Sequence, residues 1–326
     1  MLSQESLRID ARAVADDIAE GLRLQVLDTL RRKGLVVGVS GGVDSAVVAG
    51  LAARAFGPDR VLALLMPERD SMSESLQLGR AVAGHFGLPV VEESIEGVLA
   101  AAGCYRRQAE AIRIVFPDYR EGARFKLTFP QAGAGAGLNV PVLTVERPDG
   151  TLNGGRMPLD AYLQLLAATN FKQRTRKMLE YYHADRLHYA VAGTANRLEY
   201  DQGFFVKQGD GMADVKPIAH LYKTQVYQLA AYLGVPGEVT SRPPTTDTYP
   251  LPQTQEEFYF GLPYEQMDLC LYGRNQGISP GEVAAATRLT VGQVERVFAD
   301  IDRKRRASRY AHAQPLLVES VPEVDR

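Results

Sequence analysis

Cysteine and tryptophan are scarce in this chain of 326 residues, which contains two cysteines, Cys104 and Cys270, and no tryptophan. Two cysteines exclude a disulfide framework and a four-cysteine metal site, and they favour a reducing compartment, which we take to be the cytoplasm. No apolar run approaches the length needed to cross a membrane, and the first residues lack the basic and then apolar pattern of a signal peptide. A net charge of −2 provides no overall field that would attract nucleic acid or an anionic membrane.

Two common signatures of phosphate binding are also missing. The Gly-Lys dipeptide of the ordinary P-loop occurs nowhere, and the dinucleotide-binding pattern GxGxxG is absent. Its nearest approach, the stretch GAGAG at 133–137, misses the last glycine and follows no convincing strand. The chain instead has the hexapeptide SGGVDS at 40–45, directly after the apolar run at 35–39. A β-branched run that meets Ser-Gly-Gly and then resumes as an apolar segment predicts a strand, a tight loop and a helix.

The SGGVDS loop predicts an anion site. Its glycines let backbone N–H groups approach a phosphate, while the serines and the helix N-terminus add donors and partial positive charge. Asp44 would repel a phosphate unless it holds Mg²⁺ that bridges phosphate oxygens. An incidental tight turn is the alternative interpretation. The complete hexapeptide after a strand resembles the pyrophosphate loop of the ATP pyrophosphatase superfamily, whose members cleave ATP into AMP and pyrophosphate.

Strands and helices alternate along much of the chain. The apolar pattern predicts a long N-terminal helix within 1–34, strands at 35–39, 61–66, 88–91 and 188–192, and helices from 43, at 73–86, at 158–183 and at 222–234. Such alternation predicts an α/β fold with a doubly wound parallel sheet, whose ligands bind at the carboxyl ends of the strands. SGGVDS lies at such an end.

Two segments depart from this alternation. Prolines, glycines and short β-like runs predict an inserted β-rich lobe at about 101–157, with a hairpin turn at Asp149-Gly150. From about 263 to 326 we expect a helical tail, with helices at 263–273, 280–288 and 291–308. No internal repeat is visible, so we expect residues 1–326 to form one catalytic domain with this insert and tail.

A second cluster of chemically active residues follows the strand expected at 188–192. The loop after it mixes two phenylalanines with many charges, and it should emerge at the same sheet edge as SGGVDS. Glu199 can then approach Asp44, and two carboxylates suit Mg²⁺ that is held mainly by substrate phosphates. Lys207 and Lys223 are candidates to neutralise charge on phosphoryl oxygens. The alternative is a surface loop with scattered ion pairs.

Five stretches, in order along the chain, together resemble NAD synthetase. They are TNFKQRTR at 169–176, the segment from Gly193-Thr194 to Glu199, GFFVKQGDGMAD at 203–214, LYKTQ at 221–225 and PTTD at 244–247. SGGVDS alone does not separate this family from GMP synthetase, argininosuccinate synthetase or the enzymes that thiolate tRNA. The block at 203–214 is far more specific. The resemblance implies an adenine nucleotide alpha hydrolase-like fold and a homodimer.

The resemblance also implies a ligase that works in two steps with ATP and Mg²⁺. The nicotinate carboxylate of deamido-NAD attacks the α-phosphate of ATP and releases pyrophosphate, and ammonia then displaces AMP to give NAD. Glutamine-using enzymes of this type carry a nitrilase-like domain, which the 34 residues before the first strand cannot hold. We therefore expect free ammonia as the nitrogen donor, and we expect Cys104 to be a structural thiol.

Site residues are carried over by motif position. The resemblance assigns ATP binding to Gly38, Val39, Ser40, Gly41, Gly42, Val43, Asp44, Ser45, Thr194, Lys223 and Thr245. It assigns deamido-NAD binding to Asn170, Arg174, Lys207, Asp214, Arg303 and Lys304, and Mg²⁺ to Asp44 and Glu199. Asp44, Lys223 and Asp210 are the expected catalytic residues, with Asp210 orienting ammonium or acting as a base.

Two alternatives and one assembly hypothesis remain open. Many members of the family read GTDHAAE where this chain reads GTANRLE at 193–199, and the insert looks longer than in compact members. A paralogue that amidates another carboxylate is therefore the alternative to an enzyme that acts on deamido-NAD. The segment 279–296 resembles a helix-turn-helix with a basic cluster beyond it, but acidic residues dilute that cluster, which favours a role in closing over the substrates. The apolar stripe of the N-terminal helix and Tyr181-Tyr182 could supply a dimer interface, or the same residues could pack within one chain.

Overall fold

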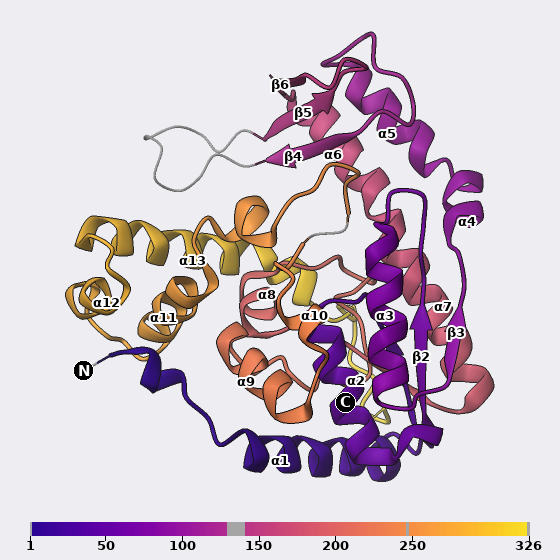
Figure 1. Ribbon diagram of the computed structural model, residues 1–326, viewed down its shortest axis with the longest axis vertical. Coiled ribbons are helices and arrows are strands. Elements are labelled where there is room, and N and C mark those ends of the chain that lie inside the picture. The colour runs from indigo at the N-terminus through magenta and orange to yellow at the C-terminus, as the bar shows by residue number, and fades with distance from the viewer. Residues whose placement is uncertain (1, 129–140, 246–247, 325–326) are drawn as a thin grey trace.

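The computed structural model describes residues 2–128, 141–245 and 248–324. The GAGAG stretch at 133–137 and the last two residues of the PTTD motif lie outside these ranges. A parallel sheet with helices, a small β lobe and a helical tail make up the described part of the chain (Figure 1).

The main sheet has four parallel strands in the order β3-β2-β1-β7. They are β1 (Leu35–Gly38), β2 (Val61–Leu65), β3 (Val90–Glu92) and β7 (Ala190–Ala192). Leu35 pairs with Val61 on one side and with Ala190 on the other. All four carboxyl ends therefore point to one edge, so the loops that follow β1, β2 and β7 meet there. The prediction of an α/β fold with a parallel sheet is confirmed.

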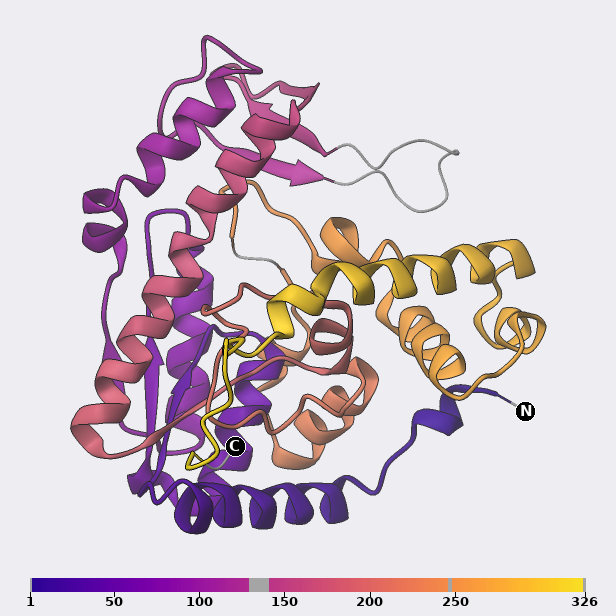
Figure 2. The ribbon, with the colours of Figure 1, turned by 180° about the vertical axis from the view of Figure 1, so that it is seen from behind.

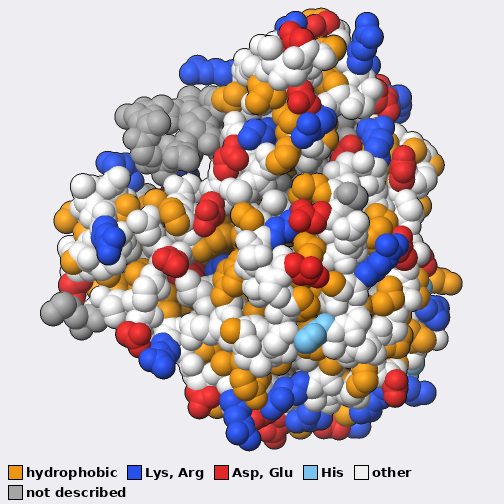
Figure 3. Space-filling model, viewed as in Figure 1, with side chains coloured by type: hydrophobic (Ala, Val, Ile, Leu, Met, Phe, Trp, Pro, Cys, Tyr) orange, Lys and Arg blue, Asp and Glu red, His pale blue; other side chains and the backbone are white. Residues whose placement is uncertain are grey.

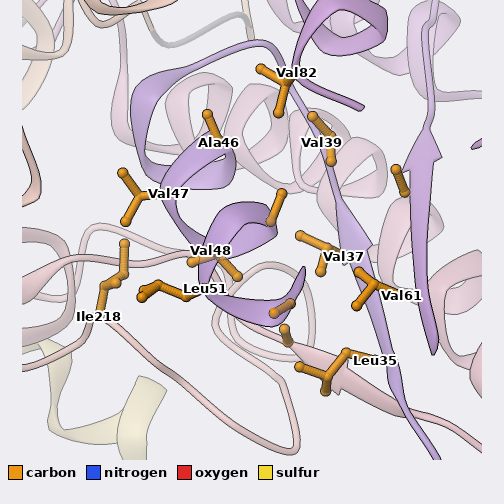
Figure 4. Close-up of a cluster of buried hydrophobic side chains, with 14 of the residues drawn as sticks. Leu35, Val37, Val39, Ala46, Val47, Val48, Leu51, Val61, Val82 and Ile218 are labelled. Carbon is orange, nitrogen blue, oxygen red and sulfur yellow. The ribbon is translucent and has the colours of Figure 1, made fainter. Parts of the chain in front are cut away.

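Both faces of this sheet are buried, which explains its nearly continuous apolar strands. On one face, Leu35 and Val37 pack against α2 (Val43–Phe56), and this cluster includes Val61 and Ile218 (Figure 4). On the other face, Val36 belongs to a cluster with residues of α4 (Glu96–Ala101) and α7 (Phe171–Leu187). The remaining helices of this part are α3 (Ser73–His85), α9 (Lys223–Leu233) and α10 (Gly237–Thr240).

The prediction of one long helix at 158–183 is wrong in detail, because the structure has two helices that meet at Asn170. α6 (Leu159–Thr169) ends where α7 begins, and Asn170, with ψ near −12°, is the cap of both. The Asn170 side chain makes no capping hydrogen bond there, so the break lies in the backbone. The loop expected at 193–217 likewise contains a short helix, α8 (Arg197–Gln202).

The N-terminal segment is not one helix. A 3₁₀ turn (Gln4–Leu7) precedes α1 (Ala11–Arg23), and α1 continues as a π-helical turn (Leu24–Thr29). Asp10 caps α1, since its Oδ1 accepts hydrogen bonds from two backbone N–H groups at 3.1 Å. The predicted stripe of Ile18, Leu22 and Val26 is buried in the core with α2 and α9. These three side chains therefore pack within one chain, as the alternative interpretation expected.

In its described residues, the inserted lobe is a three-stranded antiparallel sheet on two helices. β4 (Phe125–Thr128), β5 (Val142–Glu146) and β6 (Leu152–Arg156) share a core with α5 (Cys104–Arg113) and α6. The β structure thus begins later than the predicted 101. The turn predicted at Asp149-Gly150 is confirmed, because Gly150 has a φ of +82° and Asp149 accepts a hydrogen bond from Thr151 N at 2.9 Å.

The helical tail matches its prediction closely. It comprises α11 (Tyr264–Asn275), α12 (Pro280–Thr287) and α13 (Val291–His312), preceded by a π-helical turn (Glu256–Phe260). These helices share a hydrophobic cluster with Leu7, Leu198 and Tyr222. α13 runs from this cluster back toward α8 and the loops that follow the main sheet (Figure 2). None of the helices in the described part of the chain is long and apolar enough to cross a membrane.

Candidate active site

A cavity of about 710 Å³ lies at the carboxyl edge of the main sheet. The whole segment from Gly38 to Ser45 lines it, together with the end of β2, the first turns of α7, parts of the segments at 194–210 and 242–259, and Tyr310 of α13. Segments far apart in the sequence therefore build one site, as expected for a parallel sheet.

The predicted strand, loop and helix around SGGVDS are confirmed. β1 ends at Gly38 and α2 begins at Val43, so the loop places the N-terminus of α2 at the cavity. Gly41 has a φ of +79°, and a Cβ atom there would lie 2.5 Å from the carbonyl oxygen of Ser75, so only glycine fits. Ser45 Oγ donates to the Gly42 carbonyl at 2.9 Å, which holds the loop in shape.

Asp44 and Glu199 meet as predicted, and Lys223 and Asn196 connect them. Lys223 Nζ, which is fully buried, forms an ion pair with Asp44 Oδ2. Asn196 Nδ2 donates to Asp44 Oδ1 at 3.1 Å, and the backbone N–H of Asn196 donates to Glu199 Oε2 at 3.1 Å. This second bond is part of the capping box of α8, so the start of that helix fixes the position of Glu199.

The charges of these three groups depend on one another. Burial, and then the negative charge of Asp44, raises the pKa of Glu199 to about 8. Burial alone would lower the pKa of Lys223, but the charges of Asp44 and Glu199 raise it above its ordinary value. The negative charge of one carboxylate disfavours ionisation of the other, and a hard dication such as Mg²⁺ relieves this repulsion when both bind it. No group of three or more His, Cys, Asp or Glu side chains that could hold a metal occurs in the described ranges, so phosphate oxygens would have to complete the coordination.

The predicted deamido-NAD residues divide into two sets. Asn170, Arg174 and Lys207 line the cavity, as do Thr194 and Thr245 from the predicted ATP set. Lys207 Nζ donates to the Tyr310 carbonyl at 2.8 Å and lies 4.1 Å from the centre of the Tyr310 ring.

Asp214, Arg303 and Lys304 do not line the cavity. Asp214 accepts hydrogen bonds from Val191 N at 2.7 Å and from the Tyr181 hydroxyl at 3.1 Å. Arg303 and Lys304 both pair with Asp300, and Lys304 Nζ also donates to the Tyr259 carbonyl at 2.7 Å.

Asp210 lies in the cavity, where its Oδ1 accepts a hydrogen bond from Val206 N at 2.7 Å. Desolvation by the surrounding protein raises the pKa of Asp210, against the effect of that bond. A carboxylate with a raised pKa is a stronger base, which is relevant to its predicted role.

The helix-turn-helix interpretation gains no support from the charges of α13. Its Arg305 forms a pair with Asp201 through two bonds of 2.7 Å, and Arg303 and Lys304 are occupied by Asp300. Acidic and basic side chains are interspersed over the face of the molecule seen in Figure 3. α13 brings Tyr310 and Ala311 to the cavity.

A buried charge cluster around Lys172 was not predicted from the sequence. Its Nζ bonds to Glu68 Oε1 at 2.8 Å, Asp70 Oδ2 at 2.7 Å and the Thr248 carbonyl at 3.0 Å. Glu68 also accepts a hydrogen bond from the Tyr105 hydroxyl at 2.9 Å. Lys172 thereby ties the loop after β2 to the segment that contains Thr245. The motif TNFKQRTR signalled Lys172, but its partners lie about a hundred residues away.

The aromatic wall of the cavity also went unpredicted. Tyr162, Tyr249, Phe258 and Tyr259 line it, and Phe204 stacks on Tyr259 with ring centres 4.5 Å apart. This wall explains why a loop rich in charges carries phenylalanines.

Both cysteines are buried free thiols, and Cys104 Sγ donates to the Ala168 carbonyl at 3.2 Å. Burial raises the pKa of Cys104 to about 11 and that of Cys270 to about 12, so neither thiol is a ready nucleophile. The expectation of a structural Cys104 is confirmed.

Comparison with known proteins gives a consistent answer. The model of the family described as NAD synthase matches residues 14–132 and 151–313. An NH(3)-dependent NAD(+) synthetase of Mesorhizobium japonicum is 61% identical over 317 residues, which are 97% of this chain and 99% of that protein. The enzyme of the same name from Rhizobium rhizogenes is 58% identical over 320 residues, 98% of this chain and 96% of that one.

Solved structures with 20–21% identity share the fold. NMN synthetase from Francisella tularensis superposes with a TM-score of 0.65 over 95% of this chain and 99% of its own. The NH3-dependent NAD synthetase from Campylobacter jejuni superposes with a TM-score of 0.62 over 95% of this chain and 100% of its own. On the extent of the family match and the identity to these relatives, the chain belongs to the NAD synthase family.

Proposed function

We propose that this protein amidates deamido-NAD with ammonia and ATP to give NAD, AMP and pyrophosphate. The observation that carries the proposal is the Asp44–Lys223 pair at the N-terminus of α2, beside Glu199, in a cavity that also holds Asn170, Arg174 and Lys207. The name NH(3)-dependent NAD(+) synthetase, borne by relatives at 61% and 58% identity, supports the same reaction.

In the first step, a nicotinate carboxylate oxygen attacks the α-phosphorus of ATP, and the bond to the bridging oxygen of the pyrophosphate breaks. Negative charge builds up on the departing pyrophosphate, where the N–H groups of the SGGVDS loop and the α2 N-terminus can stabilise it. Lys223 supplies a buried positive charge at the same place. Mg²⁺, when bound by Asp44 and Glu199, would add further charge neutralisation.

In the second step, ammonia attacks the activated carbonyl carbon and AMP leaves. Ammonium must first lose a proton, and Asp210 is a group in the cavity that can accept it, because desolvation makes its carboxylate more basic. The aromatic wall around Phe204 and Tyr259 would shield the activated intermediate from water.

We further propose a single catalytic domain over 1–326 of the adenine nucleotide alpha hydrolase-like, doubly wound type, with the insert and the helical tail as its appendages. A homodimer in the cytoplasm is part of the same proposal. The exposed Met178 and Tyr182 on α7 support the dimer, since they offer an apolar face at helical spacing.

The direct test is a turnover assay with ATP, Mg²⁺, ammonium and a choice of acceptors. We expect NAD, AMP and pyrophosphate in equal amounts from deamido-NAD, and poor activity when glutamine replaces ammonium. Release of ADP and phosphate would contradict the proposal.

The acceptor requires its own control, because a structural likeness at 21% to an NMN synthetase speaks for the fold alone. Nicotinate mononucleotide should therefore be compared with deamido-NAD in the same assay. Preference for the mononucleotide would make this chain the paralogue that amidates another carboxylate.

A further inference from the structure

One buried carboxyl group in the cavity has no part in the reaction described above. Glu180, on α7, is 7% exposed and lines the cavity. Its Oε2 accepts a hydrogen bond from Lys177 Nζ at 2.5 Å. Within the ranges that the structure describes, the hydrogen bond from Lys177 reaches Oε2, and no bond to Oε1 is found. Since Glu180 lines the cavity, this second oxygen can accept a hydrogen bond from a ligand.

The position of Oε1 indicates which part of a ligand it meets. A Cβ atom on Gly38 would lie 2.8 Å from Glu180 Oε1, so the carboxylate rests against the end of β1. Gly38 is the residue from which the chain enters the phosphate loop. The neighbouring wall at the end of β2 is apolar, formed by Leu64, Leu65 and Met66. A nucleotide whose phosphates occupy the loop would place its nucleoside beside this wall.

Lys177 determines what kind of donor suits Glu180. It neutralises the carboxylate and does not itself line the cavity, while Arg176 donates to the Met66 carbonyl at 3.3 Å and adds positive charge nearby. A carboxylate paired in this way has little net charge to attract ammonium or a metal ion. It remains a good acceptor for an uncharged donor such as a hydroxyl group.

We propose that Glu180 is a further substrate-binding residue, whose Oε1 accepts a hydrogen bond from a ribose hydroxyl of ATP, and that Lys177 is the positioning residue that holds it. This inference rests on the proposed function in one respect, namely that ATP is the nucleotide at the SGGVDS loop. It provides the enzyme with a means to reject deoxynucleotides, because a missing hydroxyl leaves Oε1 desolvated and unpaired.

The experiment compares ATP with 2′-deoxy-ATP and 3′-deoxy-ATP in the wild-type enzyme and in the double variant Lys177→Met/Glu180→Leu. Replacing both partners by apolar residues leaves no buried charge unpaired, so the double variant should fold. We expect the wild type to lose roughly tenfold to a hundredfold in kcat/KM with one deoxy analogue. The double variant should bind ATP more weakly by a similar factor and treat ATP and that analogue alike. Lys177→Met alone should raise KM for ATP more than it changes kcat.

Glu93→Gln is the matched control. Glu93 pairs at 2.8 Å with His183, which lies on α7 like Lys177 and Glu180, but Glu93 does not line the cavity. This variant should prefer ATP to the deoxy analogue as strongly as the wild type does. Equal use of ATP and both analogues by the wild type would overturn the inference. So would a double variant that melts earlier but discriminates as before, because the pair would then be structural only.

Calorimetric binding of a β,γ-imido analogue of ATP and its deoxy forms separates this inference from the proposed function. A wild type that makes no NAD but binds the ribo form more tightly refutes the proposed reaction and supports the role of Glu180.

Discussion

Replacement of Lys172 by methionine should destabilise the protein strongly, although the side chains are of similar length. Lys172 is fully buried, and it is paired with Glu68, whose side chain is fully buried, and with Asp70, whose side chain is 9% exposed. The variant would leave both carboxylates in the interior without this cation. Arg69, at 3.6 Å from Asp70, offers only partial compensation.

The size of the effect follows from what removal of one partner does to a buried pair. Such a change costs about 3–5 kcal/mol, because the remaining charge is desolvated and uncompensated. Domains are stable by about 5–15 kcal/mol, so Lys172→Met should remove a large share of the free energy of unfolding. The control Lys126→Met breaks a pair with Glu257 at 2.7 Å that is partly open to solvent, and it should cost at most about 1 kcal/mol.

Urea unfolding of both variants at one pH measures the difference. Adding Glu68→Gln and Asp70→Asn to Lys172→Met should restore much of the loss, because the neutral amides no longer need a cation. Equal stability of the Lys172→Met and Lys126→Met variants would refute the reasoning. A Lys172→Met protein that is not rescued by the two amides would show that packing, and not charge, is the cause.

Three further outcomes are expected. Asp44→Asn and Glu199→Gln should each reduce turnover by orders of magnitude, and high Mg²⁺ or Mn²⁺ should restore part of it. The double variant should lose less activity than the product of the two single losses, because both changes disable one ion. A loss equal to that product, without dependence on the metal concentration, would contradict a shared ion. Without divalent cations, the free energy of unfolding should fall as pH rises from the ordinary Glu pKa of 4.5 to about 8, because the native state keeps a proton on Glu199 that the unfolded chain has lost. In thermal melts, the Glu199→Gln variant should not show this fall of stability with pH. Light scattering should give a dimer at micromolar concentration, and Tyr182→Glu, at a side chain 59% exposed, should shift it toward monomer; a monomeric wild type would remove the assembly proposal.

The parts of the fold that could be predicted are those encoded locally. Apolar strands, the SGGVDS loop and the Asp149-Gly150 turn each depend on a few neighbouring residues, and all three appear at the expected positions. The break at Asn170 was missed because the apolar pattern continues through it. The approach of Glu199 to Asp44 was predictable as well, since parallel strands bring the loops at their carboxyl ends together.

What could not be predicted depends on contacts between distant segments. Glu180 looks like an ordinary polar position of a helix, and although Lys172 lies in a recognised motif, its buried contact with Glu68 and that of Glu180 with Gly38 arise only in the fold. Arg303 and Lys304 show the same dependence on context, since a basic run suggested phosphate binding while Asp300 of the same helix pairs with both side chains.

Tyr310 has a consequence for how the enzyme becomes active. Its carbonyl accepts the hydrogen bond of Lys207, and its side chain helps to line the cavity that begins at Gly38. On the ribosome, the phosphate loop emerges long before α13, so a nascent chain can form the main sheet while Lys207 still lacks this partner. Incomplete products should therefore include folded proteins with an unfinished cavity, and a protein fused closely behind α13 would press on the wall of the site itself.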